Sequence, residues 1–304
     1  MTDNEPMLFE RFTVVGTSPG PRLLILAGVH GDEPEPMVAV KRLRRLLGRL
    51  SIRGEVTLVP TINRSAWRCK ARTGEDGLDL ARTFPGRADG DITERVAYEA
   101  ARLIRAADYL IDLHTGGKRL RLWPLAGYLL HPQSDVLDEQ RALARAFNLP
   151  VVWGTSPALD GRTLSEARDA NVPAIYVEYL GAMSFSRAAV TAMVDGCLNV
   201  MAHFRMIERA PQVDRVQFQA EQGGAGAGHL QASQPAPVAG MFSAAVELGK
   251  KVALGDTLGW LAPHSSAEEL PIAAEQGGRI VCLRVDPQVE PGDGLAVIVP
   301  FDEE

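Results

Sequence analysis

Apolar strand-like segments alternate with amphipathic helix-like segments through the first two-thirds of the chain, and this order most constrains the fold. Short apolar runs bounded by glycine, proline or polar residues are typical of buried strands; they occur at residues 22–29, 55–60, 109–113 and 174–177. Apolar side chains at helical spacing lie between them, at residues 36–50, 93–107 and 138–147. Such alternation predicts an α/β fold with a mostly parallel sheet covered by helices on both faces.

The composition changes abruptly near residue 222. Residues 223–228 read GGAGAG, which is too rich in glycine for a helix or strand, and short β-type segments separated by glycine follow. We therefore predict two domains, residues 1–222 and an all-β domain of residues 223–304. The second resembles the barrel-sandwich fold of biotinyl and lipoyl carrier domains, but the hairpin that would correspond to the carrier turn, at residues 273–278, has no lysine. A swinging-arm role is therefore not expected.

Bulk composition argues against several classes of partner. The 304 residues carry a formal net charge of -6, which gives no general affinity for nucleic acid or anionic membranes. No apolar run approaches the roughly 18 residues of a membrane helix, and no secretory signal is visible. The three cysteines form no C-x-x-C pair, which fits a reducing compartment. We expect a cytoplasmic protein, and the sequence leaves homo-oligomerisation open.

Two of the six histidines stand at the ends of predicted strands. His30 follows the first strand in VHGDEP, with Glu33 three residues later, and His114 lies in DLHTGG. In a parallel sheet both histidines would emerge at the carboxyl edge, where open α/β folds bind ligands. Two histidines and a carboxylate form a ligand set of catalytic zinc sites, which leave a fourth position for water. The same set also accepts cobalt, manganese or iron(II).

Each of these residues also has an ordinary structural explanation. His30 can cap a strand, and Glu33 can be an acid favoured by the positive end of a helix. Glu178 follows an apolar strand, where a carboxylate needs a partner or a polar cleft, but it can also be a surface residue. Asp112 lies on the same side of its strand as His114 and can either orient that histidine or pair with another buried group.

Taken together, the motifs resemble a known family. The HGDE segment that begins at His30, the DLHTGG segment around His114 and the strand-terminal Val177–Glu178 look like those of the succinylglutamate desuccinylase/aspartoacylase family, compact relatives of the zinc carboxypeptidases. Several motifs match in order and spacing, over about residues 20–205, and the C-terminal β domain also fits the family. The resemblance implies a zinc-carboxypeptidase-like fold, with a mostly parallel or mixed sheet flanked by helices.

The resemblance also implies site roles. His30, Glu33 and His114 would hold one Zn²⁺ per chain, and Glu178 would act as general base. Residues 63–86 look like the substrate loop of the family. Within it, Arg72 corresponds to an arginine that polarises the scissile carbonyl.

Further residues are expected to contact the substrate. By the same resemblance, Arg82 would hold a carboxylate or similar polar group, and we also expect Asn63 to bind substrate. Tyr179 is close enough in sequence to Glu178 to line the pocket. One departure is Ala81, because the family usually has asparagine immediately before the arginine. This change puts the identity of the substrate in doubt.

The predicted activity is hydrolysis of the amide bond in a small N-acylated, amino-acid-like molecule. Rival interpretations are a carboxypeptidase, which needs a peptide-sized cleft, and an esterase that uses the same zinc site. A third is a catalytically silent binding or regulatory protein that keeps the fold. The predicted metal ligands and base are all present, and only Ala81 favours the silent protein.

Overall fold

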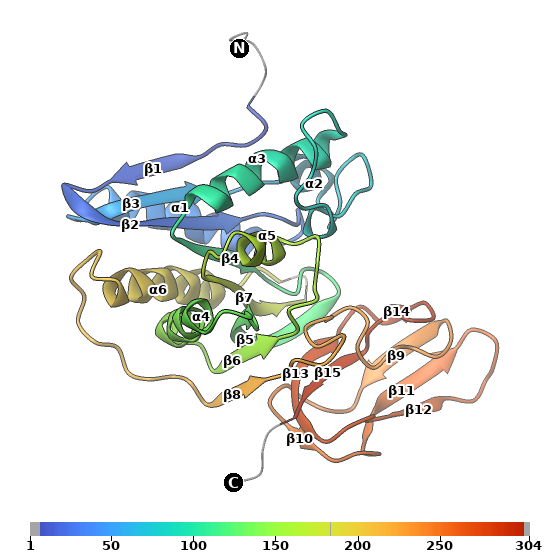
Figure 1. Ribbon diagram of the computed structural model, residues 1–304. Coiled ribbons are helices and arrows are strands. Elements are labelled where there is room, and N and C mark those ends of the chain that lie inside the picture. Colours follow the sequence, from blue (N-terminus) through green and yellow to red (C-terminus); the bar gives the residue numbers. More distant parts are fainter. Residues whose placement is uncertain (1–6, 183, 301–304) are drawn as a thin grey trace.

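The computed structural model describes residues 7–182 and 184–300, and it centres on one large mixed sheet (Figure 1). Its main path runs β1-β3-β2-β4-β7-β5, with β6 and β8 continuing beside β5. These strands are β1 Phe12–Val15, β2 Ser18–Ala27, β3 Arg53–Val59, β4 Tyr109–His114, β5 Leu120–Leu129, β6 Val151–Thr155, β7 Ala174–Gly181 and β8 Phe218–Glu221. The β3-β2-β4-β7 core is parallel, whereas β1 and β5 pair antiparallel with β3 and β7. The sheet is therefore mixed.

Helices cover both faces of this sheet, as the alternating pattern predicts (Figure 1). The helices are α1 Pro34–Leu47, α2 Arg64–Cys69, α3 Ile92–Ala106, α4 Ser134–Phe147, α5 Thr163–Asp169 and α6 Arg187–His203, with a 3₁₀ turn, η1, at Leu80–Arg82. Alternate residues of β2 show the two layers. Ile25 packs in one cluster with α1, α4 and α6, and Leu26 packs in another with α3 and α5. No helix within the described residues is long and apolar enough to cross a membrane.

Substitutions on the buried and exposed faces of α1 test this packing. Leu43 is 1% exposed, and Leu43→Ala is expected to lower the free energy of unfolding by about 3 kcal/mol, because the lost side chain leaves a cavity. Val38 in the same helix is 40% exposed, so Val38→Ala should change that free energy by less than about 0.5 kcal/mol. Urea denaturation of both variants measures the difference. Equal losses would contradict the assigned buried face.

The secondary-structure elements described for the C-terminal region are all β-strands, as predicted, but three of these strands belong to the large sheet. They are β9 Gly240–Ala244, β10 Lys251–Val252, β11 Thr257–Pro263, β12 Leu270–Ala273, β13 Gly278–Arg284, β14 Gln288–Val289 and β15 Ala296–Val299. A four-stranded sheet has the order β12-β11-β9-β14, while β13 pairs with β5 of the large sheet, so that Cys282 lies opposite Leu122. The two parts are therefore joined by backbone hydrogen bonds.

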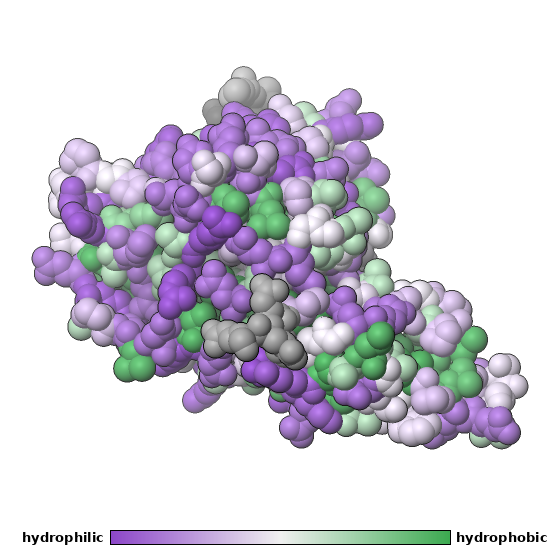
Figure 2. Space-filling view, turned by 60° about the horizontal axis from the view of Figure 1, so that its bottom comes forward, coloured by the Kyte–Doolittle hydropathy of each residue, from purple (hydrophilic) through white to green (hydrophobic). Residues whose placement is uncertain are grey.

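A separate apolar cluster joins the four-stranded sheet to the C-terminal strands of the large sheet. It combines Phe242 and Leu261 from the four-stranded sheet with Ile280 and Ile298 from β13 and β15. This is a two-layer β arrangement; the closer likeness to a barrel sandwich and the boundary at residues 222 and 223 stay predictions. Large apolar side chains also remain exposed in this region, Trp260 among them, and Figure 2 shows hydrophobic residues grouped there.

Candidate active site

Three neighbouring parallel strands bring the predicted residues to one edge of the sheet. His30 and Glu33 lie in the loop after β2, and His114 is the last residue of β4. On β7, Glu178 lies directly opposite His114 in the strand register. The loop can pass close to the backbone of α2 because Gly31 has no side chain. A Cβ on Gly31 would lie 1.9 Å from the carbonyl oxygen of Ala66.

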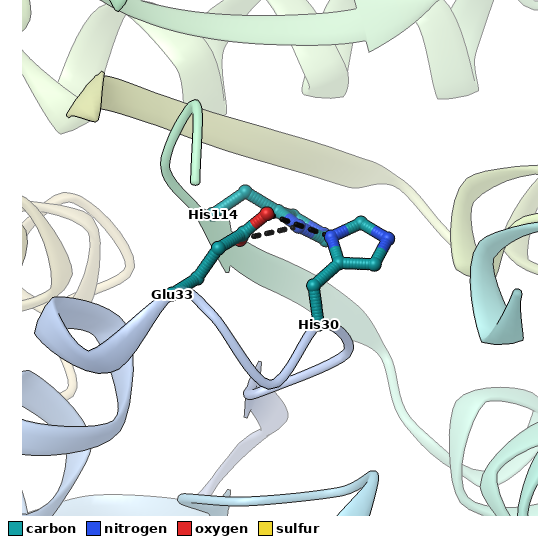
Figure 3. A group of neighbouring side chains, drawn as sticks. All are labelled: His30, Glu33 and His114. Carbon is teal, nitrogen blue, oxygen red and sulfur yellow. Dashed lines mark hydrogen bonds and ion pairs between the residues drawn. The ribbon is translucent and has the colours of Figure 1, made fainter. Parts of the chain in front are cut away.

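The two histidines and Glu33 form a compact buried cluster (Figure 3). The Nδ1 atom of His30 lies 2.7 Å from Glu33 Oε1, and the Nδ1 atom of His114 lies 3.2 Å from Glu33 Oε2. One donor atom from each residue falls within 4.8 Å of the others, and all three residues are less than 9% exposed. This donor set and spacing suit a small divalent cation, because imidazole nitrogen and carboxylate oxygen are its common ligands.

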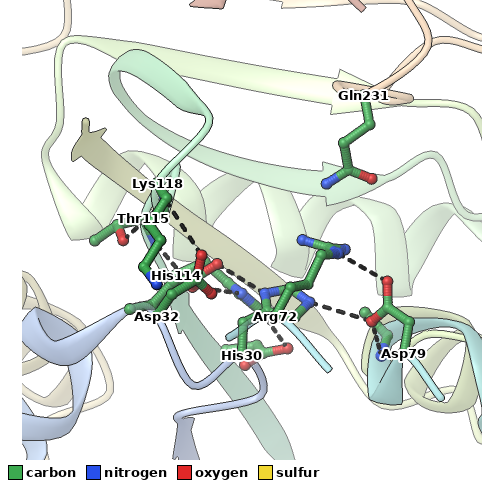
Figure 4. Close-up of polar contacts among 12 residues, drawn as sticks. His30, Asp32, Arg72, Asp79, His114, Thr115, Lys118 and Gln231 are labelled. Carbon is green, nitrogen blue, oxygen red and sulfur yellow. Dashed lines mark hydrogen bonds and ion pairs between the residues drawn. The ribbon is translucent and has the colours of Figure 1, made fainter. Parts of the chain in front are cut away.

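An aspartate stands behind each histidine. Asp112 Oδ2 lies 3.0 Å from His114 Nε2 and also accepts a hydrogen bond from Thr163. Asp79 Oδ1 lies 3.3 Å from His30 Nε2, within ion-pair range but outside hydrogen-bond geometry (Figure 4). A carboxylate at the distal nitrogen fixes the ring and makes the other nitrogen a better metal ligand. Both histidines therefore present Nδ1 to Glu33, and Asp112 lies where the sequence predicted.

The charges of the cluster favour a bound cation. Burial alone would raise the pKa of Glu33, but His30 and His114 outweigh it and hold that pKa well below its usual range. Burial lowers the pKa of His114, but Asp112 and Glu33 raise it well above the usual value on balance. The same close packing of buried carboxylate and imidazole groups would attract a metal ion, whose binding displaces protons from the histidines.

The Asp112 carboxylate gives a test of this arrangement. Asp112→Asn is expected to weaken metal binding by about 10- to 100-fold, because it removes the charge that orients His114. Asp108, just before β4, pairs with Arg22 at the surface, so Asp108→Asn is a matched control with unchanged metal affinity. Competition against a chromophoric chelator measures both affinities. Unchanged affinity in Asp112→Asn would show that the aspartate does not support the metal ligand.

Glu178 faces the same cavity with an unsatisfied carboxylate. Its Oε2 atom is buried and has no hydrogen-bond partner among the described residues. Burial, reinforced by the negative charge of Glu33, raises the pKa of Glu178 well above its usual value, although His114 opposes this shift. A carboxylate with a raised pKa and a free oxygen is suited to accept a proton from water and to give it up again.

Arginines line the other side of a cavity of about 90 Å³. Arg72 donates from Nε to Asp79 at 2.9 Å, which links it to His30 (Figure 4). Arg82 and Arg162 also line the cavity and form no ion pair within the described part of the chain. Burial, with Arg82 nearby, lowers the pKa of Arg162 to about 10. These two guanidinium groups make the cavity attractive to an anion.

Arg162 was missed by sequence reasoning, and two predicted contacts lie elsewhere. Arg162 directly precedes α5 as its N-cap residue, and no motif in the sequence marks it. Asn63 does not line the cavity: it caps α2, accepting from Ala66 N at 3.0 Å. Tyr179 also does not line it, because successive strand residues point to opposite faces; Tyr179 packs against the α1–α4–α6 cluster, and Tyr176 shares the cavity with Glu178.

Comparison with known proteins decides the family. Residues 19–204 match the model of the succinylglutamate desuccinylase/aspartoacylase catalytic domain. The chain belongs to the succinylglutamate desuccinylase/aspartoacylase family. It is therefore a hydrolase of the class that cleaves amide bonds. The matched segment contains the buried cluster, Glu178 and all three arginines.

Individual relatives cover nearly the whole chain. An Nα-acetyl-L-2,4-diaminobutyric acid deacetylase of Halomonas elongata is 31% identical over 300 residues, which is 96% of this chain and 85% of the relative. The product-bound ectoine utilization protein EutE (DoeB) of Ruegeria pomeroyi superposes with a TM-score of 0.85 at 26% identity, covering 96% and 88% of the two chains. A family member from Rhodobacter sphaeroides shares the fold, with a TM-score of 0.84, 24% identity and coverage of 95% and 88%. The match thus includes the C-terminal β region.

Proposed function

We propose that this protein is a zinc-dependent deacylase that hydrolyses the amide bond of a small N-acylated amino acid. One observation carries the proposal. The His30–Glu33–His114 cluster faces the same cavity as Glu178, whose buried Oε2 atom has no hydrogen-bond partner among the described residues. Zinc held by the cluster would supply Lewis-acid chemistry, making water more acidic and polarising a carbonyl.

The residues around the cavity have separate roles in this reaction. Glu178 takes a proton from the attacking water, whose oxygen forms a bond to the amide carbon. Arg72 keeps its Nε on Asp79 and has its Nη atoms free to stabilise the developing negative oxygen. When the C–N bond breaks, Glu178 returns its proton to the departing amine. The products are a carboxylate and a free amine.

The substrate class follows from charge and access. Arg82 and Arg162 offer positive charge without an ion-pair partner in the described chain, which suits the free carboxylate of an N-acyl amino acid. Gly228 and Leu230, from the segment after β8, also line the cavity. A wall from the C-terminal region favours a small substrate over a long peptide. The deacetylase of Halomonas elongata acts on such a small acetylated amino acid.

The first experiment measures metal and activity together. Purified protein is analysed for bound metal, then assayed against a panel of N-acetyl, N-succinyl and N-formyl amino acids that includes Nα-acetyl-L-2,4-diaminobutyric acid. We expect about one zinc per chain, loss of activity after chelation, and recovery when zinc is restored. Hydrolysis that persists in fully metal-free protein, or metal-loaded protein that hydrolyses no amide on the panel, would refute the proposal.

A further inference from the structure

The C-terminal region reaches into the catalytic cavity through residues 228–236, here called the cavity segment. Gly228 and Gln231 of this segment line the cavity. Gly228 has a φ of +90°, and a Cβ there would lie 2.9 Å from the side chain of Leu159. The cavity segment therefore packs closely against Leu159 and against Thr155 at the end of β6, beside the cavity that Gln231 lines.

A turn near the C-terminus holds the cavity segment in position. Gly294 donates its backbone N–H to the carbonyl oxygen of Gln231 at 2.7 Å, and Ala236 donates to Asp293 at 2.8 Å. A Cβ on Gly294 would come within 2.6 Å of the Gln231 carbonyl carbon, so only glycine allows this approach. The turn is fixed in its own region by Arg284, whose Nη2 lies 3.0 Å from Asp293 Oδ2. Gln231 is thus placed by a turn more than 60 residues away in sequence.

The side chain of Gln231 binds the arginine that faces the cavity. Its Oε1 accepts from Arg82 Nη2 at 3.1 Å, while Arg82 Nη1 donates to the carbonyl oxygen of Ala81. Figure 4 shows Gln231 pointing from the C-terminal region toward the side of the cavity that holds Arg72. The Ala81 side chain has no polar group to offer. The amide that contacts Arg82 therefore comes from the C-terminal region.

The Gln231 side chain is neutral, so its contact leaves the positive charge of Arg82 uncompensated. A guanidinium group has five N–H donors, and these two contacts leave others free. The Gln231 amide orients Arg82 without cancelling its charge, whereas a carboxylate at the same place would form a bidentate ion pair and occupy the group. The positive charge of Arg82 thus stays available to a ligand in the cavity.

We propose that Gln231 is a specificity-determining residue, which orients Arg82 and keeps its charge free so that the site selects substrates with a carboxylate over neutral analogues. The inference rests on the proposed deacylase function for its substrate class. It gives the C-terminal region a direct part in choosing the substrate. Gln231 acts through Arg82 and is a positioning residue.

The test compares acid and amide forms of one substrate. The best substrate of the panel and its carboxamide are assayed with the unmodified protein, Gln231→Glu and Gln231→Leu. Gln231→Glu should raise KM for the acid by about tenfold or more, because the introduced carboxylate would compete with the substrate for the guanidinium, and Gln231→Leu should raise it less. We expect kcat, and KM for the carboxamide, to change by less than about threefold.

A matched control separates charge from position. Gln219 on β8 is exposed and does not line the cavity, so Gln219→Glu adds the same charge without effect on either substrate. Equal changes of KM for acid and carboxamide, or a fall in kcat alone, would overturn the inference and mark Gln231 as merely structural. The inference would also be overturned if the unmodified protein showed no preference for the acid over the carboxamide.

Binding distinguishes this inference from the proposed function. Calorimetry with Nα-acetyl-L-2,4-diaminobutyric acid and its carboxamide measures the preference without turnover, whether or not the protein hydrolyses either compound. An unmodified protein that binds the acid more tightly, loses that preference in Gln231→Glu and hydrolyses neither compound would support the inference while refuting the deacylase function. Hydrolysis without any preference for the acid would refute the inference about Gln231 while supporting the deacylase function.

Discussion

Glu178→Gln is expected to lower kcat for amide hydrolysis by about a thousandfold or more while leaving bound metal unchanged. Glutamine keeps the size of the side chain but cannot accept a proton from water. The group of predicted metal ligands does not include Glu178, so the His30–Glu33–His114 contacts remain. Steady-state kinetics and elemental analysis of the same preparation measure both quantities.

The neighbouring tyrosine provides the control for this prediction. Tyr179 lies on the other face of β7 and packs in the helix-covered core, so Tyr179→Phe should keep kcat within about threefold of the unmodified value. Two outcomes would contradict the assigned roles. One is near-normal kcat in Glu178→Gln, and the other is a large loss in Tyr179→Phe, which would restore the substrate-binding role expected from the sequence.

The metal cluster and the candidate base are the parts of the site that the sequence makes accessible. His30 and Glu33 follow an apolar strand and His114 ends one, while Glu178 comes directly after the apolar residues 174–177 inside β7; neighbouring parallel strands bring these positions to the same edge. Local pattern therefore predicts their proximity, and the family resemblance adds the roles. The same logic places Asp112 on the side of its strand that carries His114, but the sequence left open whether the two residues contact each other.

Arg162 and Gln231 could not be found in the same way. Neither residue stands in a motif or at a periodic position, and each enters the cavity only because a distant segment folds back. Gln231 depends on its backbone contact with Gly294, which is a long-range contact that no local pattern encodes. Tyr179 was expected at the cavity because it is next to Glu178 in sequence. Neighbouring strand residues point to opposite faces of the sheet, and Tyr179 packs under the helices instead.

The fold was predictable where periodicity is regular. The parallel core and the helices α1, α3 and α4 follow from hydrophobic spacing, but β5 does not. Pro124 interrupts its pattern, and the β5–β7 register shifts between Leu122 and Leu125. Proline has no backbone N–H to donate to a neighbouring strand, so its presence in this segment argues against a strand when only the sequence is considered. The pairing of β5 with β13 then joins segments about 160 residues apart, which explains why the C-terminal region looked independent.

Glu33→Gln is expected to weaken metal binding by more than about a hundredfold, a larger loss than is typical when a partner behind a ligand is removed. The Glu33 carboxylate contacts both histidines and also accepts from the backbone N–H of Thr115 at 3.0 Å. Glutamine can keep only part of these contacts and carries no charge to balance a cation. Metal content after dialysis against a chelator measures the loss.

Asp32 provides a matched control for Glu33→Gln, because it directly precedes Glu33 and carries the same charge. Its carboxylate accepts from the backbone N–H of Lys118 at 3.2 Å and takes no part in the cluster. Asp32→Asn removes one negative charge beside the site and should leave metal content unchanged. If both variants lost metal equally, general negative charge rather than direct ligation would explain binding. Loss in Glu33→Gln alone requires that the carboxylate itself hold the ion, as its position between the two Nδ1 atoms indicates.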